Sequence, residues 1–205
     1  MSSVTIVDYG AGNLRSVQQA FWVAGADPVT TSNPDDVSHA ERLVLPGVGA
    51  AGAALAAIRT RGLDEAMADV RRSGRPVLGI CLGLQMMAEE VNELGVHRGL
   101  GWMRGRVDRI APAADIRVPH MGWSQVDTTE RGAGLIGESL KDRSFFFCHS
   151  NRLFADEDVA AATVLYGESF TVAVRFENVF AVQFHPEKSQ IAGQRLLKRF
   201  LDWAP

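Results

Sequence analysis

Cysteine is scarce in this chain, because its 205 residues include only Cys81 and Cys148. Two cysteines cannot build a disulfide framework or a cysteine-rich zinc site, and these two do not form a Cys-x-x-Cys pair. Long apolar runs are also missing: the longest uncharged stretch, Leu43 to Ile58, is short for a membrane span and is interrupted by Pro46 and three glycines. The N-terminus lacks the basic segment and apolar core of a secretory signal. We therefore expect a protein of the reducing cytoplasm, with free thiols and no membrane association.

An excess of positive charge is absent as well. Lys and Arg number 21 against 24 Asp and Glu, which gives a formal net charge of −3. Nucleic-acid binding needs clustered basic residues, so the sequence argues against that function class. Apolar residues make up 46% and charged residues 22% of the chain. These values are typical of a globular protein, and we expect residues 1–205 to form a single domain.

Signals for a metal or a nucleotide cofactor are weak. His39, His97, His120 and His149 show no metal-ligand spacing, so surface or core positions are the ordinary interpretation. Gly10-Ala11-Gly12-Asn13 resembles part of a dinucleotide loop, but an arginine stands where the third glycine should be, and no Walker loop is present. We expect neither a metal nor another cofactor.

The first half of the chain alternates short β-rich runs with helical patterns. Strands are expected at 4–7, 28–30, 42–45 and 77–80, and helices at about 14–24, 50–59, 63–73 and 82–90. This alternation predicts right-handed βαβ units on a parallel sheet. Later runs at 144–148, 161–166 and 171–184 look like strands, with a hairpin turn at Glu177-Asn178. An amphipathic helix with Ile191, Leu196, Leu197 and Phe200 on one face ends the chain. The predicted fold class is α/β, a mostly parallel central sheet flanked by helices, with antiparallel strands added.

The sharpest local signal is Gly79-Ile80-Cys81-Leu82-Gly83, which has the Gly-x-nucleophile-x-Gly form of a nucleophile elbow. Small residues flank the nucleophile because Cβ atoms would clash where the chain turns sharply from strand to helix. A thiol at a helix N-terminus is favoured as the thiolate, and the next backbone N–H, that of Leu82, can bind an oxyanion. A buried structural cysteine is the ordinary alternative. Cys148 lies within a strand pattern, where a small core residue is expected.

His185-Pro186-Glu187 follows an apolar run and supplies the partners that a cysteine nucleophile needs. An imidazole acts as the base, and a carboxylate two residues on, across a rigid proline, can reach back to the ring and hold its tautomer. Pro46-Gly47-Val48-Gly49 also follows a strand, at the same edge of the parallel sheet as Cys81. Its glycine-rich backbone could present N–H groups to an oxyanion, although an ordinary strand-to-helix turn explains the glycines equally well.

These segments together resemble the class I, triad-type glutamine amidotransferases. The class is indicated by Gly79-Ile80-Cys81-Leu82-Gly83-Leu84-Gln85 and Gln183-Phe184-His185-Pro186-Glu187-Lys188-Ser189. Further segments resemble the glutaminase subunits of imidazole glycerol phosphate synthases, from histidine biosynthesis: Asp8-Tyr9-Gly10-Ala11-Gly12-Asn13-Leu14, Leu45-Pro46-Gly47-Val48-Gly49, Pro119-His120-Met121-Gly122-Trp123 and His149-Ser150. The resemblance covers nearly the whole chain in the right order, and it implies a flavodoxin-like fold.

The resemblance also implies a reaction. Cys81 would attack the side-chain amide of glutamine and form a glutamyl thioester, while His185 moves the protons and Glu187 orients His185. The N–H groups of Val48 and Leu82 would bind the oxyanion, and the Val48 amide would first have to turn inward. Glutamine would be held by Gly47, Gly49, Gln85, Glu93, His149 and Ser150. The ammonia would pass to a separate (β/α)₈-barrel cyclase in a heterodimer, through an interface at Asn13, Pro119, His120, Met121, Gly122, Trp123 and Lys188.

Some positions depart from the family pattern. Ser124 stands where Asn is usual, Asn151 where an aromatic residue is usual, and Cys148 where Val is usual. We expect Trp123 on an exposed loop as an interface anchor, although a core tryptophan is the ordinary alternative. Two other functions stay open. The chain could be a related glutaminase subunit serving another acceptor, such as a sugar-amidination system, or a non-enzymatic interaction subunit, which the intact triad disfavours.

Overall fold

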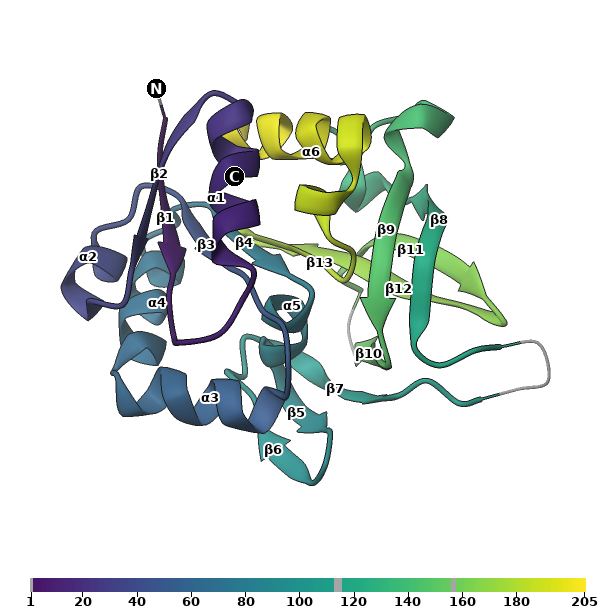
Figure 1. Cartoon of the computed structure of the whole chain (residues 1–205), viewed down its shortest axis with the longest axis horizontal. Coiled ribbons are helices and arrows are strands. Elements are labelled where there is room, and N and C mark those ends of the chain that lie inside the picture. Colours follow the sequence, from purple (N-terminus) through teal and green to yellow (C-terminus); the bar gives the residue numbers. More distant parts are fainter. Residues whose placement is uncertain (1, 113–115, 156–157) are drawn as a thin grey trace.

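The computed structural model describes residues 2–112, 116–155 and 158–205, and within them the strands form one sheet of nine and one of four (Figure 1). The larger sheet has the order β2-β1-β3-β4-β13-β12-β11-β8-β9. Its first five strands are parallel: β2 (Ala26–Thr31), β1 (Ser2–Val7), β3 (Leu43–Leu45), β4 (Val77–Ile80) and β13 (Val179–Val182). Its other four are antiparallel: β12 (Glu168–Phe176), β11 (Ala160–Tyr166), β8 (His120–Thr128) and β9 (Ser144–His149). The predicted parallel sheet with antiparallel additions is confirmed.

Helices cover both faces of the parallel strands, because alternate side chains of each strand are buried on opposite sides. Ile6 and Val44 belong to one buried cluster, and Val7 and Leu45 belong to the other. The first cluster is completed by α1 (Leu14–Val23) and α6 (Gln190–Asp202), which lie together in Figure 1. The second is completed by α2 (Pro34–Ser38), α3 (Ala51–Thr60) and α4 (Leu63–Arg72). In the described part of the chain, no helix is long and apolar enough to cross a membrane.

The final helix differs from its expected pattern at one position. Leu196, Leu197 and Phe200 are buried as predicted, but Ile191 is 66% exposed. Ile191 lies in the first turn of α6, before the helix packs fully against the core. The prediction that all four residues share the buried face is therefore wrong for Ile191.

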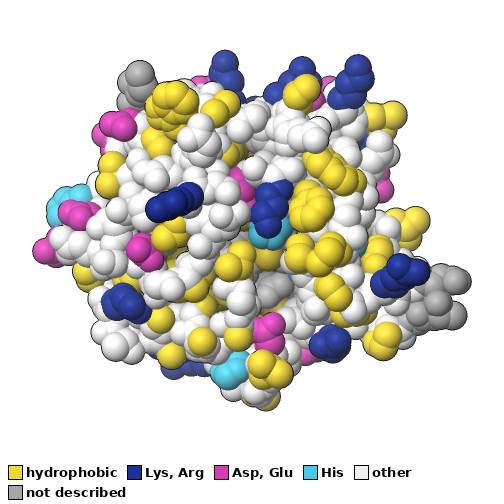
Figure 2. Space-filling view, viewed as in Figure 1, with side chains coloured by type: hydrophobic (Ala, Val, Ile, Leu, Met, Phe, Trp, Pro, Cys, Tyr) yellow, Lys and Arg dark blue, Asp and Glu magenta, His cyan; other side chains and the backbone are white. Residues whose placement is uncertain are grey.

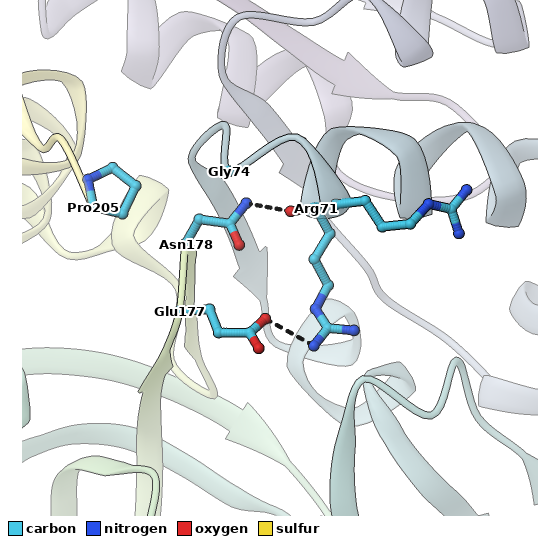
Figure 3. A pocket seen from close by; sticks show the side chains of 6 residues that line it. Arg71, Gly74, Glu177, Asn178 and Pro205 are labelled. Carbon is cyan, nitrogen blue, oxygen red and sulfur yellow. Dashed lines mark hydrogen bonds and ion pairs between the residues drawn. The ribbon is translucent and has the colours of Figure 1, made fainter.

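The β12–β13 hairpin turns at Glu177 and Asn178, as predicted. The Asn178 amide donates to the backbone carbonyl of Arg71 at 3.0 Å and to that of Arg75 at 2.6 Å. Glu177 accepts a hydrogen bond from the Arg71 guanidinium at 2.9 Å (Figure 3). Since β4 follows α4 directly, these contacts hold β13 in register beside β4.

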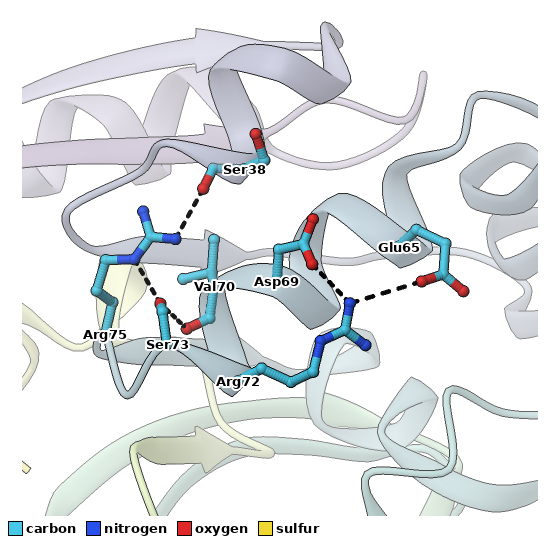
Figure 4. Close-up of polar contacts among 7 residues, drawn as sticks. All are labelled: Ser38, Glu65, Asp69, Val70, Arg72, Ser73 and Arg75. Atoms are coloured by element: carbon cyan, nitrogen blue, oxygen red, sulfur yellow. Dashed lines mark hydrogen bonds and ion pairs between the residues drawn. The ribbon is translucent and has the colours of Figure 1, made fainter.

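Arg75 fixes the turn between α4 and β4. Its guanidinium donates to the Ser38 carbonyl at 2.8 Å and to the Ser73 hydroxyl at 2.6 Å (Figure 4). It also donates to the Ala40 carbonyl at 2.8 Å. Asp69 and Glu65 pair with Arg72 on the exposed side of α4 (Figure 4). The Arg75 contacts join the end of α2 to the segment before β4, so the chain is anchored just ahead of the strand that leads to Cys81.

The smaller sheet was not predicted. The helix expected over 82–90 ends early, because α5 covers only Leu82–Met86 and is followed by β5 (Ala88–Asn92). The N–H of Leu100 donates to the Met86 carbonyl at 2.7 Å and that of Trp102 to the Met87 carbonyl at 2.8 Å. A distant segment therefore satisfies the carbonyls that a longer helix would have used. The sheet has the order β10 (Asn151–Ala155), β7 (Met103–Arg109), β5 and β6 (Val96–Arg98).

Candidate active site

Cys81 stands between β4 and α5 with φ 54° and ψ −106°. A positive φ on a residue with a side chain is strained, and it is the backbone feature of a nucleophile elbow. A Cβ on Gly79 would lie 2.9 Å from the Ala181 Cβ, and a Cβ on Gly83 would overlap the Leu45 carbonyl oxygen. The expected need for small residues on both sides of Cys81 is confirmed.

His185 follows β13, the strand that pairs with β4 in parallel register. The N–H of Cys81 donates to the Val182 carbonyl at 2.7 Å, so the two chain segments leave the sheet side by side. The Nδ1 atom of His185 lies 2.8 Å from Oε1 of Glu187, and the two side chains are only 3% and 2% exposed. The carboxylate therefore reaches back to the ring across Pro186, as predicted from the spacing.

The charge state of His185 follows from its neighbours. Burial lowers the pKa of an imidazole, but hydrogen bonds to Cys81 and Glu187 and the negative charge of both outweigh burial and raise the pKa of His185 to about 10. The raised pKa favours the protonated form of the ring. Since Nδ1 faces Glu187, Nε2 is the atom that remains for the sulfur. Gln183 adds a second donor, with Nε2 at 3.5 Å from the Cys81 Sγ.

A cavity of about 350 Å³ opens beside Cys81. Eleven of the predicted site residues line it: Val48, Gly49, Cys81, Leu82, Gln85, Glu93, Pro119, His149, Ser150, His185 and Lys188. Cys148 and Asn151, which were not predicted as site residues, complete the lining. Outside this lining lie Asn13, Gly47, His120, Met121, Gly122, Trp123 and Glu187. A larger cavity of about 600 Å³, at the contacts of Figure 3, has no cysteine or histidine in its lining.

Glu93 is held in the cavity wall by two donors. The Asn151 side-chain amide donates to Oε1 at 2.8 Å, and the Ala51 backbone N–H donates to Oε2 at 2.6 Å. A carboxylate fixed in this way presents its remaining lone pairs in a set direction, which suits a cationic group. Asn151 was noted in the sequence only as a departure from an aromatic residue, and its contact with Glu93 could not be seen there.

The side-chain amide nitrogen of Gln85 donates both of its hydrogens to other groups of the protein. Its Nε2 donates to Oε1 of Gln183 at 2.9 Å and to the Asn151 carbonyl at 3.3 Å. Both N–H hydrogens are therefore used, and only the Gln85 carbonyl oxygen is left for a ligand. Gln183 also contacts Cys81, so it links the sulfur to the cavity wall. It appeared in the sequence only as part of the motif around His185.

His149 and His120 form a hydrogen-bonded pair between the cavity and β8. The Asn151 carbonyl, which can only accept, lies 2.8 Å from Nδ1 of His149 and so places the proton there. Nε2 of His149 then accepts from Nδ1 of His120 at 3.1 Å, and Nε2 of His120 accepts from the Ser124 hydroxyl at 2.9 Å. Burial lowers the pKa of both rings to about 4, which keeps this neutral arrangement. An asparagine at position 124 would place an amide beside His120 instead of a hydroxyl.

The two expected oxyanion donors do not converge in this conformation. The N–H of Leu82 donates to the Gly47 carbonyl at 3.4 Å. The C=O and N–H of a trans peptide point in opposite directions, so the Val48 N–H, in the same peptide as that carbonyl, points away from Leu82. Tyr9, which sequence reasoning did not single out, donates its hydroxyl to the Pro46 carbonyl at 3.1 Å.

Two expectations about the rest of the site change, while the expected exposure of Trp123 is confirmed. His120, Met121, Gly122 and Trp123 begin strand β8 and do not lie in a loop. Because side chains alternate along a strand, His120 is buried while Met121 and Trp123 are 63% and 49% exposed. Cys148 lies in β9, as its pattern predicted, but it is half-buried and lines the cavity, so its assignment to the core is wrong.

The face of the molecule drawn in Figure 2 carries side chains of mixed character. Hydrophobic side chains gather around a histidine and a basic side chain near the middle of the face in Figure 2. Lys188 is exposed and its Nζ lies 5.9 Å from the centre of the Phe146 ring. Asn13 precedes α1 without capping it through its side chain.

Among the residues that the structure describes, no three His, Cys, Asp or Glu side chains lie together so as to hold a metal ion.

Comparison with known proteins agrees with this geometry. A family model described as "Glutamine amidotransferase class-I" matches residues 5–203. The imidazole glycerol phosphate synthase subunit HisH of Rhodopirellula baltica is 49% identical over 96% of this chain and 96% of its own length. The chain belongs to the HisH family of class I glutamine amidotransferases.

Other HisH relatives and solved structures extend the match. The HisH subunit of Zymomonas mobilis is 44% identical over 100% of this chain and 97% of its own. The solved structure of PurLQS from Thermotoga maritima superposes with a TM-score of 0.75 over 98% of both chains, at 17% identity. At that identity the superposition establishes the fold alone, and it agrees with the predicted class I amidotransferase architecture. The chain thus matches HisH subunits over nearly their whole length, and the predicted nucleophile and base follow the neighbouring strands β4 and β13.

Proposed function

We propose that this chain hydrolyses glutamine to glutamate and ammonia with Cys81, His185 and Glu187, as the glutaminase subunit of an imidazole glycerol phosphate synthase in histidine biosynthesis. The observation that carries the proposal is the contact of the Glu187 carboxylate with the buried His185 ring, which lines one cavity together with the strained Cys81. The likeness to HisH subunits over almost the whole chain supports the pathway.

The first half of the reaction begins from a protonated His185. The Cys81 thiolate attacks the side-chain carbonyl carbon of glutamine and forms a carbon–sulfur bond, which places negative charge on the carbonyl oxygen. As the tetrahedral species collapses, the carbon–nitrogen bond breaks and Nε2 of His185 gives its proton to the leaving nitrogen. Ammonia and a glutamyl thioester result. Glu187 stabilises the imidazolium and fixes which nitrogen faces the sulfur.

The second half returns the enzyme to its starting state. The now neutral His185 takes a proton from water, and the hydroxide attacks the thioester carbon. The carbon–sulfur bond breaks, the new carboxylic acid releases its proton to solvent as glutamate leaves, and Cys81 is again a thiolate beside a protonated His185. No redox step or external acid is required.

Glutamine recognition is assigned to the cavity wall. The fixed carboxylate of Glu93 is placed to pair with the α-ammonium group of the substrate, because its oxygens are oriented by Asn151 and Ala51. The free carbonyl oxygen of Gln85 can accept from substrate N–H groups. We assign the remaining contacts to Gly47, Gly49, His149 and Ser150, of which only Gly47 lies outside the cavity lining.

The partner is proposed to be a (β/α)₈-barrel cyclase that receives the ammonia and makes imidazole glycerol phosphate and aminoimidazole carboxamide ribotide. The exposed side chains of Met121 and Trp123 on β8, with Lys188 at the cavity mouth, are suited to such an interface. Residues 1–205 are proposed to act as one amidotransferase domain. Because the reaction needs a free Cys81 thiol, the reducing cytoplasm remains the expected location.

Glutamate release tests this assignment, measured for the chain alone and with the barrel cyclase and its nucleotide substrate. Cys81→Ala should abolish glutamine-dependent product formation and leave ammonia-dependent formation by the complex intact, because the acceptor chemistry is on the partner. The matched control is Cys148→Val, which removes the other cavity thiol and should keep most of the activity. Glutamine use that survives in Cys81→Ala, or disappears in Cys148→Val, contradicts the assignment.

The same assay separates the other functions. Robust hydrolysis that no histidine-pathway nucleotide or cyclase stimulates would point to a glutaminase for another acceptor. No hydrolysis under any condition would point to a non-enzymatic subunit.

A further inference from the structure

Asn151 lies at the start of β10, in the wall of the cavity beside Cys81. The residue is only 6% exposed, and its amide Nδ2 donates to Oε1 of Glu93 at 2.8 Å. The other end of this amide, the Oδ1 atom, accepts no hydrogen bond from residues 2–112, 116–155 or 158–205. The described part of the protein therefore uses only one end of a nearly buried polar group in the cavity wall.

The backbone of Glu93 is fixed independently of Asn151. Its carbonyl accepts a hydrogen bond from Nε2 of His97 at 2.9 Å. The His97 ring lies directly against α3, because a Cβ on Gly52 would overlap it. The Ala51 N–H, at the start of α3, donates to Oε2 of Glu93 at 2.6 Å. If the Asn151 amide is removed, the turn that carries Glu93 keeps its place, and only the direction of the carboxylate can change.

Glu93 and Asn151 together offer acceptors on one wall of the cavity. The Glu93 carboxylate keeps lone pairs beyond those that its two N–H donors use, and Oδ1 of Asn151 keeps both of its own. An α-ammonium group carries three N–H donors, a positive charge and no acceptor, so it matches this pair. A nearly buried acceptor without a donor is costly, which also favours a ligand that donates to it. An aromatic side chain at position 151 has no amide and could not make both contacts.

We propose that the Asn151 side chain is a specificity-determining residue for the α-ammonium group of glutamine, which its Oδ1 atom and the Glu93 carboxylate bind together. The inference rests on the proposed glutaminase function and adds to it a contact from β10. The donated N–H orients Glu93, while the amide oxygen accepts a second ammonium hydrogen. The Asn151 backbone has a separate role, because its carbonyl accepts from His149 and Gln85 whatever the side chain is.

Two substrates distinguish this role from a general effect on the pocket. Glutaramate is glutamine without its α-amino group, and release of the carboxylate product can be measured for both with the cyclase and its nucleotide substrate present. In the wild type, kcat/KM should be about 10²-fold or more higher for glutamine, because the analogue leaves the acceptors unpaired. In Asn151→Ala, the KM for glutamine should rise about 10-fold with an unchanged kcat, since a bond to a charged group is lost and the reacting residues are untouched. The values for glutaramate should stay the same.

The matched control is Asn92→Ala. The Asn92 amide also donates to a carboxylate, that of Asp108 at 2.7 Å, and Asn92 directly precedes Glu93 but does not line the cavity. Both substrates should be hydrolysed as in the wild type. An equal rise of the glutamine KM in Asn92→Ala and Asn151→Ala would show that the KM reports the turn and would refute the inference. An equal loss for both substrates in Asn151→Ala contradicts it as well. If Asn151→Ala does not fold, Asn151→Leu keeps the volume and takes the same test.

Glutamine binding to complexes that carry Cys81→Ala gives a readout without catalysis. Adding Asn151→Ala should weaken the glutamine Kd about 10-fold in titration calorimetry and leave the glutaramate Kd unchanged. A glutamine Kd that does not move overturns the inference, and the proposed function still stands if the wild type hydrolyses glutamine. If no condition gives hydrolysis, the proposed function fails, and the two Kd values still decide whether Asn151 recognises the ammonium group. Equal hydrolysis of both substrates by the wild type refutes the inference without any variant.

Discussion

The buried pair of neutral histidines makes the stability of this protein sensitive to mild acid. His120 and His149 are 2% and 6% exposed, and their hydrogen bonds use both rings in the neutral form. Protonating either ring adds a proton where an acceptor is needed and places a charge in the core. We therefore expect a lower free energy of unfolding when the pH falls from 6.5 to 5.0.

The magnitude follows from the two pKa values. Both are lowered from 6.5 to about 4 by burial, so between these values the unfolded chain binds more protons than the folded one, and stability falls as the pH falls. Over 1.5 pH units at about 1.36 kcal/mol per unit, each ring contributes a loss of about 2 kcal/mol. We expect a total of about 2 to 4 kcal/mol for the pair. The raised pKa of His185 changes the stability only above pH 6.5, and the lowered pKa values of Asp108 and Asp142 change it only below pH 3.8. None of these groups therefore contributes to the loss between pH 6.5 and pH 5.0.

Urea denaturation at pH 6.5 and pH 5.0 measures this loss. In His120→Gln, one titrating ring is gone, and the loss should shrink by about 2 kcal/mol. Ser124→Ala keeps both rings and serves as the control, so most of the loss should remain. A wild-type stability that is equal at both pH values would show that the rings are hydrated in solution and would refute the reasoning.

The remaining predictions concern catalysis, the interface and the elbow. His185→Ala should reduce glutamine turnover by about 10²- to 10⁴-fold, and Glu187→Gln should reduce it by less. If a double-mutant cycle gives independent, multiplicative losses, Glu187 lies outside the proton-transfer unit. Trp123→Ala should weaken cyclase binding by roughly 2 kcal/mol or more, measured by titration calorimetry. Its melting temperature should not change, because the side chain is half exposed. Unfolding of the variant would instead make Trp123 a structural residue. Gly83→Ala should lower the free energy of unfolding by about 1–3 kcal/mol in urea, because its Cβ meets the Leu45 carbonyl, and a silent substitution would mean that the elbow can relax.

Local sequence patterns predicted the parts of the fold that are built locally. Alternating strands and helices gave the parallel core, and the Glu177-Asn178 turn gave the hairpin that ends it. The contact between His185 and Glu187 was also predictable, because only a proline separates them and the carboxylate has one ring within reach. In each case the determining interactions lie within a few residues of one another.

The second sheet could not be predicted for the opposite reason. Residues 82–90 have a helical pattern, but the chain leaves the helix at Met86 because Leu100 and Trp102 supply its next hydrogen bonds. Tertiary contacts of this kind override local propensity. They also explain why β8 was taken for a loop. The strand begins at His120, with Pro119 before it and Gly122 near its start, so its β-strand sequence pattern is weak, and pairing with β9 determines its structure.

In the cavity wall, too, some residues could be named from the sequence and others acquire their contacts only in the folded chain. Cys81 was named from its own motif and Gln85 and Glu93 through the resemblance, and the structure brings the three to one cavity. Asn151 and Gln183 acquire their contacts only because separate strands meet there, and no spacing in the sequence relates them to Glu93 or Cys81.

The hydrogen-bonded pairing of β4 with β13 fixes the positions of the two reacting residues independently of the length of chain between them. Backbone pairing of Ile80 with Val182 sets the spacing between nucleophile and base, whatever the chain does in between. That interval includes the turn between β5 and β6, where Leu94 is 95% exposed, and lengthening such a turn is inexpensive: each doubling of loop length adds about 0.6 kcal/mol. Extra segments can therefore be accommodated between the two reacting residues without moving them apart. An architecture of this kind can acquire new docking surfaces for different acceptor enzymes while its hydrolytic pair stays the same.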